Sequence, residues 1–189
     1  MRTALNHNQK GVFKGSFTTK QAMPGMGTPH FSENGLALHK TFGVPYLPAS
    51  SIKGMLRAWL TDSSMLLEGD KLKNWEDRIS ELFGSESDEE SSPAAKGMLT
   101  FHDALFAEFK LRKDVMTVHT PSYYLGKQWN ANEKPIPIEF AYIEGSVPIV
   151  ISWEQSDKLP SDINDILRSG LTNALRYYGI GAKKSGGVW

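Results

Sequence analysis

Alternating apolar and polar residues predict the first strand of the chain. Across residues 11–19 the apolar side chains Val12, Phe13 and Phe17 stand among lysine, serine and threonine, with the two-residue period of a half-buried strand. Prolines and glycines then interrupt the pattern and exclude a helix. We interpret residues 21–44 as a long excursion from the domain, and loops of this length are usually functional or disordered.

Three stretches show the spacing of apolar residues that is typical of amphipathic helices. They cover residues 52–60, 75–83 and 161–178. Pro48 cannot lie inside the first helix, so Ser50 or Ser51 is its expected N-cap. Gly84 is the expected stop of the second helix. The third helix leads straight into a glycine-rich stretch.

The other apolar runs predict further strands. Residues 96–104 fit a strand, and residues 106–111 fit a strand or a turn. Residues 135–143 and 147–153 fit a β-hairpin that turns through residues 144–146. The resulting order of strands and helices is compatible with an α+β, ferredoxin-like domain.

The composition fits a cytoplasmic protein of one domain. The chain has 189 residues, of which 40% are hydrophobic, enough for a core. It has no cysteine, so a disulfide framework and a thiolate metal site are excluded. No apolar run reaches the roughly 18 residues that span a bilayer, and residues 1–7 lack the apolar part of a secretory signal. We expect neither a metal nor a cofactor.

The formal net charge of zero conceals an uneven distribution. Residues 61–92 hold ten acidic and three basic residues, a charge of about −7, so the rest of the chain carries about +7. The most acidic part predicts a solvated loop at about residues 85–96. The remainder is basic enough to meet a polyanion.

The start of the first helix combines features that suit an anion. Lys53 and Arg57 lie four residues apart near the positive end of the helix dipole, which they oppose. Gly54 costs roughly 1 kcal/mol relative to alanine in a helix. An anion held by backbone N–H groups, these cations and the hydroxyls of Ser50 and Ser51 would explain both costs. An ordinary capped helix with solvated basic residues is the alternative.

The glycine-rich stretch predicts a ligand that carries phosphates. Glycines let backbone N–H groups approach a ligand closely, and lysines add positive charge. The expected contacts are Arg176, Gly179, Gly181, Lys183, Lys184, Ser185 and Gly186. Their order does not match a nucleotide-hydrolysing P-loop. A flexible tail is the alternative.

An aromatic loop is expected at residues 114–129. His119, Tyr123 and Tyr124 could stack on bases, a contact of about 1–3 kcal/mol per base. Alternatively, the aromatic residues of this loop cover the edge of the core.

Three sets of residues resemble one known family. Residues 45–57, Pro-Tyr-Leu-Pro-Ala-Ser-Ser-Ile-Lys-Gly-Met-Leu-Arg, closely resemble the helix-start motif of RAMP proteins, the RRM-like subunits of CRISPR effector complexes. Residues 179–187 resemble their glycine-rich loop. Residues 97–104, 114–124 and 135–140, in this order, are most similar to the sixth subunit of the type III-B (Cmr) complex.

The resemblance implies one RRM-like domain over residues 1–189 that binds RNA without cutting it. Such a subunit holds the 3′ part of the CRISPR RNA and its target RNA in antiviral defence. Its partners are neighbouring RAMP proteins and a small helical subunit. RAMP subunits that cut target RNA use an aspartate after the first strand, and residues 21–44 contain none. Met23, Met26 and His30, on this thumb-like insertion, are expected to contact the duplex.

Two other functions remain open. Some RAMP relatives are metal-independent ribonucleases that process the CRISPR transcript with a histidine. His30 or His39 could act as the general acid or base, because imidazole titrates near neutral pH. The third possibility is a protein-binding cap of the filament that touches no RNA.

Overall fold

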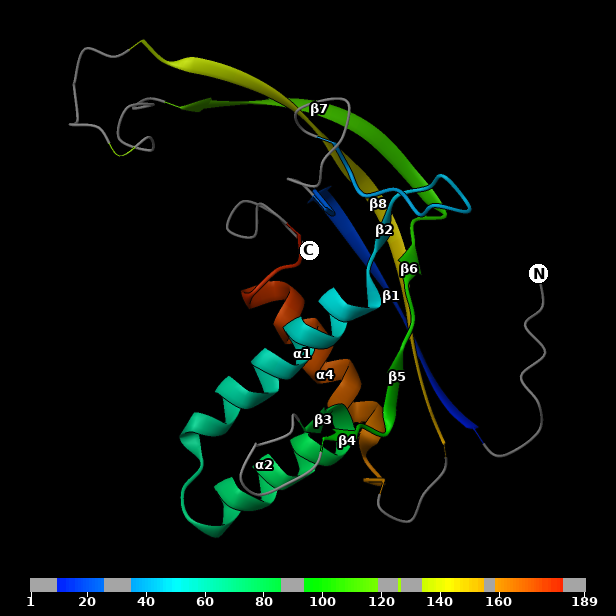
Figure 1. Ribbon diagram of the computed structural model, residues 1–189, viewed down its shortest axis with the longest axis vertical. Helices are drawn as coiled ribbons and strands as arrows, with labels where there is room; N and C mark the ends of the chain where they lie inside the picture. The colour runs from blue at the N-terminus through cyan, green and yellow to red at the C-terminus, as the bar shows by residue number, and fades with distance from the viewer. Residues whose placement is uncertain are drawn as a thin grey trace.

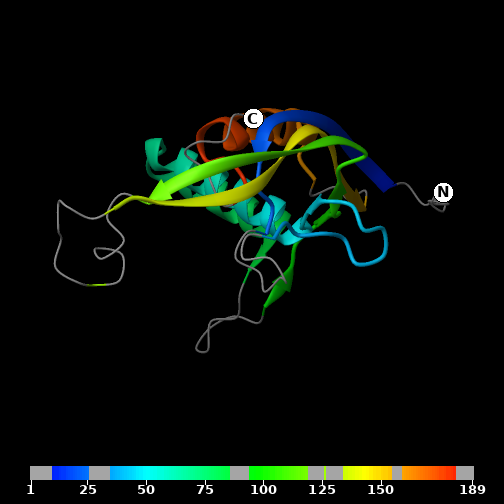
Figure 2. The same cartoon turned by 90° about the horizontal axis from the view of Figure 1, so that it is seen from above.

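An antiparallel sheet with helices on one face forms the body of the protein (Figures 1 and 2). The computed structural model describes residues 10–25, 35–85, 94–118, 126, 134–154 and 159–181. The elements are β1 (Lys10–Ala22), β2 (Tyr46–Leu47), α1 (Ala49–Ser63), η1 (Ser64–Leu66), α2 (Asp70–Phe83), β3 (Gly84–Ser85), β4 (Ala95–Lys96), β5 (Leu99–Phe101), β6 (Ala104–Leu105), β7 (Glu108–Val118), β8 (Ile136–Glu154) and α4 (Ile163–Tyr177). The expected α+β class is confirmed.

The long strand β8 is the centre of the sheet. β1 pairs with it in antiparallel fashion along the C-terminal part of β8. On the other side of β8, β5 pairs with its C-terminal end and β7 with its N-terminal half. Beyond the end of β1, β7 and β8 continue together as a two-stranded arm that extends away from the helices (Figure 1). One strand therefore builds both the body and the arm.

The predicted hairpin through residues 144–146 is wrong, because β8 runs through them without a turn. Gly145 pairs with Thr19 of β1 on one side and with Phe109 of β7 on the other. A Cβ at Gly145 would lie 2.5 Å from the carbonyl oxygen of Glu108. The glycine therefore permits a close approach of two strands.

Other predicted boundaries also shift, because pairing with β8 overrides weak local signals. The strand expected over residues 96–104 is divided into β4, β5 and β6. β7 includes residues 114–118, which were expected in the aromatic loop, and β1 continues to Ala22. The acidic loop expected at residues 85–96 lies mostly outside the described residues, and its two flanks pair as β3 and β4.

The core lies between the sheet and the helices. Ile149 and Ile151 of β8 and Leu167 of α4 have no exposed surface. α1 crosses α4 at Gly170, where a Cβ would lie 2.8 Å from Cδ1 of Leu56. Within the described part of the chain, no helix is long and apolar enough to cross a bilayer. This core holds the start of α1 and the end of α4 in place.

Candidate nucleic-acid interface

Asp103, from the connection between β5 and β6, anchors the start of α1. Its Oδ1 accepts a hydrogen bond of 2.7 Å from the amide of Ala49. The amides of Ser51 and Ile52 donate to the carbonyl oxygen of Pro48 at 3.0 and 3.2 Å. The chain itself therefore satisfies most of the amides at this helix end.

This arrangement corrects the anion site that the sequence predicts. Pro48 is the N-cap and makes no side-chain cap bond, so Ser50 and Ser51 lie inside the first turn. The carboxylate of Asp103 already compensates the positive end of the helix dipole. Most backbone amides of the predicted site thus donate hydrogen bonds within the protein. Only the side chains of the site remain available to an anion.

Those side chains lie on the outer side of α1. Ser50, Ser51 and Gly54 are exposed, and Lys53 and Arg57 are half-buried. Neither cation forms an ion pair with any of the described residues. A Cβ at Gly54 would meet nothing within 4 Å, so packing does not require a glycine there. The surface of α1 beside the two cations is therefore open.

Gly179 and Gly181 form a turn that follows α4 and lies against the end of β1. Their φ angles are +67° and +98°. The amide of Gly179 donates to the carbonyl oxygens of Ala174 and Leu175 at 3.1 and 3.2 Å, so it ends the helix. A Cβ at Gly181 would lie 2.9 Å from the carbonyl oxygen of Met23. The expectation that the Gly179 amide holds a phosphate is therefore wrong.

Met23 is buried, with 3% of its surface exposed. The prediction that its side chain contacts a duplex is therefore wrong. The chain turns after Met23, and the carbonyl oxygen of Pro24 accepts a hydrogen bond of 2.8 Å from the amide of Ala37. Several further predicted contacts lie outside the described residues: Met26, His30, His119, Tyr123, Tyr124, Lys183, Lys184, Ser185 and Gly186.

His39 belongs to a small aromatic cluster. Its ring is stacked on Phe42 at 5.0 Å and meets Tyr46 edge-on at 5.4 Å, measured between ring centroids. The amide of Thr41 donates to its Nδ1 at 3.3 Å. No group of three or more acidic or histidine side chains in the described ranges could hold a metal ion. These contacts indicate a structural role for His39.

An aromatic stack, which the sequence analysis missed, joins the end of α4 to α1. Tyr177, 65% exposed, lies nearly parallel to Trp59 with ring centroids 5.3 Å apart. Tyr178 meets Trp59 edge-on and donates a hydrogen bond to Asp62. The guanidinium carbon of Arg176 lies 5.7 Å from the centroid of Tyr177. The stack fixes the end of α4, and with it the glycine turn, relative to α1.

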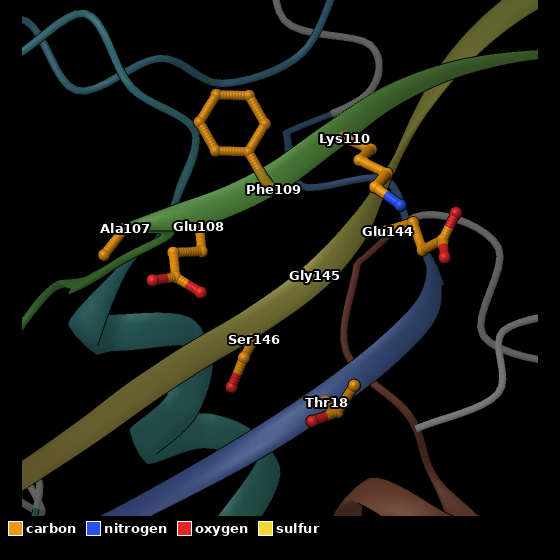
Figure 3. A pocket seen from close by; sticks show the side chains of 8 residues that line it. All are labelled: Thr18, Ala107, Glu108, Phe109, Lys110, Glu144, Gly145 and Ser146. Carbon is orange, nitrogen blue, oxygen red and sulfur yellow. The ribbon is translucent and has the colours of Figure 1, made fainter.

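Two hollows along β1 differ in charge. The first has a volume of about 560 Å³ and lies where β1, β8 and β7 meet (Figure 3). Among the described residues that line it, Glu108 and Glu144 are accompanied by one cation, Lys110, so it does not suit a phosphate. The second has a volume of about 500 Å³ and lies between β1 and α4. Arg176 is the only charged residue among the described residues that line it.

The sheet with helices on one face, followed by a glycine turn after the last helix, defines an RRM-like α+β domain. A sequence model of the RAMP superfamily matches residues 12–188, and the chain belongs to this family. The match confirms the family resemblance of the helix-start and glycine-rich motifs, both of which it includes.

Several solved structures are similar to this chain. A chain of the type III-B Cmr-beta complex bound to cognate target RNA is 22% identical, with a TM-score of 0.68 over 94% of this chain and 56% of that chain. A chain of a type IV-B CRISPR complex is 12% identical, with a TM-score of 0.54 over 92% of this chain and 85% of that chain. Cmr6 from Pyrococcus furiosus is 22% identical over 95% of both chains, with a TM-score of 0.47. No curated protein matches the sequence.

Proposed function

We propose that this protein is a non-catalytic RNA-binding subunit of a type III-B CRISPR (Cmr) ribonucleoprotein, most like the sixth subunit. It holds the 3′ part of the CRISPR RNA and the target RNA, beside neighbouring RAMP proteins and a small helical subunit. Membership of the RAMP superfamily carries this proposal. The fold shared with a Cmr-beta chain, from a complex bound to target RNA, supports it.

The outer side of α1 is the proposed contact with the RNA backbone. Lys53 and Arg57 are the charges available there, because no described carboxylate pairs with them. Gly54, between them, leaves the helix surface bare. Lys183 and Lys184 would add further phosphate contacts. Such contacts position an RNA without reading its sequence, which pairing between guide and target would read.

Two observations support a role without catalysis. Residues 21–44 contain no aspartate, and His39 is engaged by two aromatic rings and a backbone amide. We therefore expect labelled repeat RNA to stay intact when it is incubated with the protein in EDTA. Cleavage that disappears in a His39→Ala or His30→Ala variant would instead support the ribonuclease.

Binding of a labelled single-stranded RNA at several salt concentrations tests the RNA contact. The variant Lys53→Ala, Arg57→Ala removes two proposed phosphate contacts. The slope of the logarithm of affinity against the logarithm of salt concentration should become shallower by about 1.4, since each contact on a single strand contributes about 0.7. The matched control is Lys71→Ala, Lys73→Ala, which removes two exposed lysines from the acidic segment on α2.

The control should keep the slope of the wild type. Equal slopes for both double variants would contradict the proposed contact on α1. A wild type that binds no RNA even at low salt would contradict the RNA-holding role and favour a protein-binding cap.

A further inference from the structure

β1 is an edge strand of the sheet, beside α4 (Figure 1). Among the described strands it pairs with β8 alone, so no strand of the described residues lies along its other edge. In an antiparallel pair, every second residue directs both its N–H and its C=O away from the partner strand. β1 is 13 residues long and contains no proline. This edge can therefore accept a further strand.

A groove with a volume of about 500 Å³ lies between this edge and α4. Ser16 and Thr18 are among the residues that line it, yet their side chains belong to the opposite face of the sheet. The Oγ atom of Ser16 lies 2.9 Å from that of Ser146, and Thr18 points into the hollow beside Ser146 (Figure 3). Ser16 and Thr18 therefore present their backbone to the groove. Phe17, which packs against the core, and Leu175 form its apolar floor.

The helix side of the groove is positively charged. Arg168, Thr172 and Arg176 follow one another at intervals of one turn on the same side of α4, and all three are exposed. Thr172 donates its hydroxyl proton to the carbonyl oxygen of Arg168 at 2.8 Å, so its oxygen can accept a further hydrogen bond. Neither arginine forms an ion pair with the described residues, and no described carboxylate lines the groove. The groove is thus complementary to an acidic ligand.

Neighbouring aromatic rings hold the guanidinium of Arg176 in place. Its central carbon lies 5.7 Å from the ring centroid of Tyr177, and Tyr177 is stacked on Trp59 at 5.3 Å. A side chain that is already ordered loses less conformational freedom when it binds a carboxylate. Arg176 is therefore the best placed cation of the groove.

We propose that this groove binds an extended acidic segment of a partner protein, which pairs with the outer edge of β1 as an added strand. Main-chain hydrogen bonds to β1 supply affinity, and alternate side chains of the segment enter the groove and select its sequence. A carboxylate of the segment meets Arg176, and an apolar side chain two residues away covers Phe17 and Leu175. The inference goes beyond the proposed function, because it does not require the chain to bind RNA.

An RNA strand is a poorer match for this edge. The edge offers N–H donors and C=O acceptors, and an extended polypeptide complements both. Phosphate oxygens only accept hydrogen bonds, so a phosphate backbone would leave the carbonyl groups of β1 unpaired beside its own negative charge. The backbone lining of the groove therefore favours a peptide.

The test uses a fluorescein-labelled peptide of sequence Thr-Val-Thr-Glu-Thr-Val-Thr-Glu, blocked at both ends, and measures its binding to the intact chain by fluorescence anisotropy. One comparison peptide has lysine in place of both glutamates, and the other is N-methylated at its inner amides. Both should bind at least about tenfold more weakly, the second because it loses several main-chain hydrogen bonds. Hydrogen exchange at residues 15–18 should slow when the acidic peptide is added, because their outward amides gain acceptors.

Arg176→Glu reverses the charge of the groove. The acidic peptide should bind this variant at least about fivefold more weakly than the wild type, and the lysine peptide should bind it more tightly than the wild type. Arg78→Glu on α2 is the matched control, because Arg78 is also exposed and its guanidinium carbon lies 5.9 Å from the ring centroid of Trp75. This control should bind the acidic peptide as the wild type does. Thermal unfolding midpoints that match the wild type confirm that both variants are folded.

Several outcomes would overturn the inference. These are no binding of the acidic peptide, equal binding of the N-methylated peptide, or equal losses in the two glutamate variants. Slower exchange at residues 15–18 with single-stranded RNA but not with the peptide would assign the groove to nucleic acid. Slow exchange there without any peptide, in a chain that sediments as a dimer, would assign the edge to a second copy. Each of these results leaves the RNA-binding test of α1 unaffected, so this inference and the proposed function can fail separately.

Discussion

Replacing Gly54 by alanine should stabilise the protein and weaken its binding to RNA. Gly54 lies inside α1, where glycine costs about 1 kcal/mol relative to alanine. The new Cβ would meet nothing within 4 Å, so no packing penalty offsets the gain. The free energy of unfolding should rise by about 1 kcal/mol, and the midpoint of thermal unfolding by about 2–4 °C for a chain of this size.

The effect on binding follows from the position of Gly54 between Lys53 and Arg57. If an RNA backbone lies against the helix there, a methyl group intrudes on a close contact. RNA affinity should fall by at least about fivefold, the lower end of the cost of overpacking. Ala58, exposed one turn later, offers the reciprocal control. Ala58→Gly should lose about 1 kcal/mol of stability and bind RNA as the wild type does.

Urea unfolding followed by circular dichroism gives the stability of each variant, and fluorescence anisotropy at fixed salt gives its RNA affinity. A Gly54→Ala variant no more stable than the wild type would refute the argument from helix propensity. A stabilised variant with unchanged RNA affinity would refute the close approach of RNA at this position.

Three further substitutions test the fold by urea unfolding. Asp103→Ala removes the acceptor of the first amide of α1 and should cost about 0.5–2 kcal/mol; a stability equal to wild type would show that this bond contributes nothing. Gly97→Ala would place a Cβ 2.5 Å from the amide nitrogen of Gly84 and should cost about 1–3 kcal/mol. An unchanged stability would exclude that crowding. Glu144→Gln breaks an exposed ion pair of 3.2 Å between β7 and β8 and should cost less than about 1 kcal/mol, so a larger loss would reveal a second role.

The spacing of apolar residues predicted those helices and strands whose pattern is complete within one stretch of the sequence. α1, α4 and most of β1 follow from the spacing of their own apolar residues. Gly145 misled the prediction, because a glycine between two apolar runs looks like a turn until its partners on both neighbouring strands are known. The burial of Met23 likewise depends on packing that only the folded chain creates, with Gly181 against its backbone.

The backbone part of the candidate site could not be predicted from the sequence, and the role of its side chains stays a prediction. Lys53 and Arg57 form no ion pair with the described residues, so both remain candidates for contact with an anion. The amides beside them were expected to be open, yet Asp103, 54 residues away in the sequence, satisfies the first of them. A local sequence pattern does not identify a hydrogen-bond acceptor that lies so far away in the sequence. The stack of Trp59 and Tyr177 was missed for the same reason.

The continuity of β8 has a mechanical consequence. A strand of 19 residues has a contour length of about 60 Å at roughly 3.3 Å per residue. Because the body and the arm share this strand, the arm cannot swing as a separate unit without breaking the pairing with β1 and β7 around Gly145. The position of the arm is therefore coupled through β8 to that of the sheet, and a displacement of one bears on the hydrogen bonds of the other.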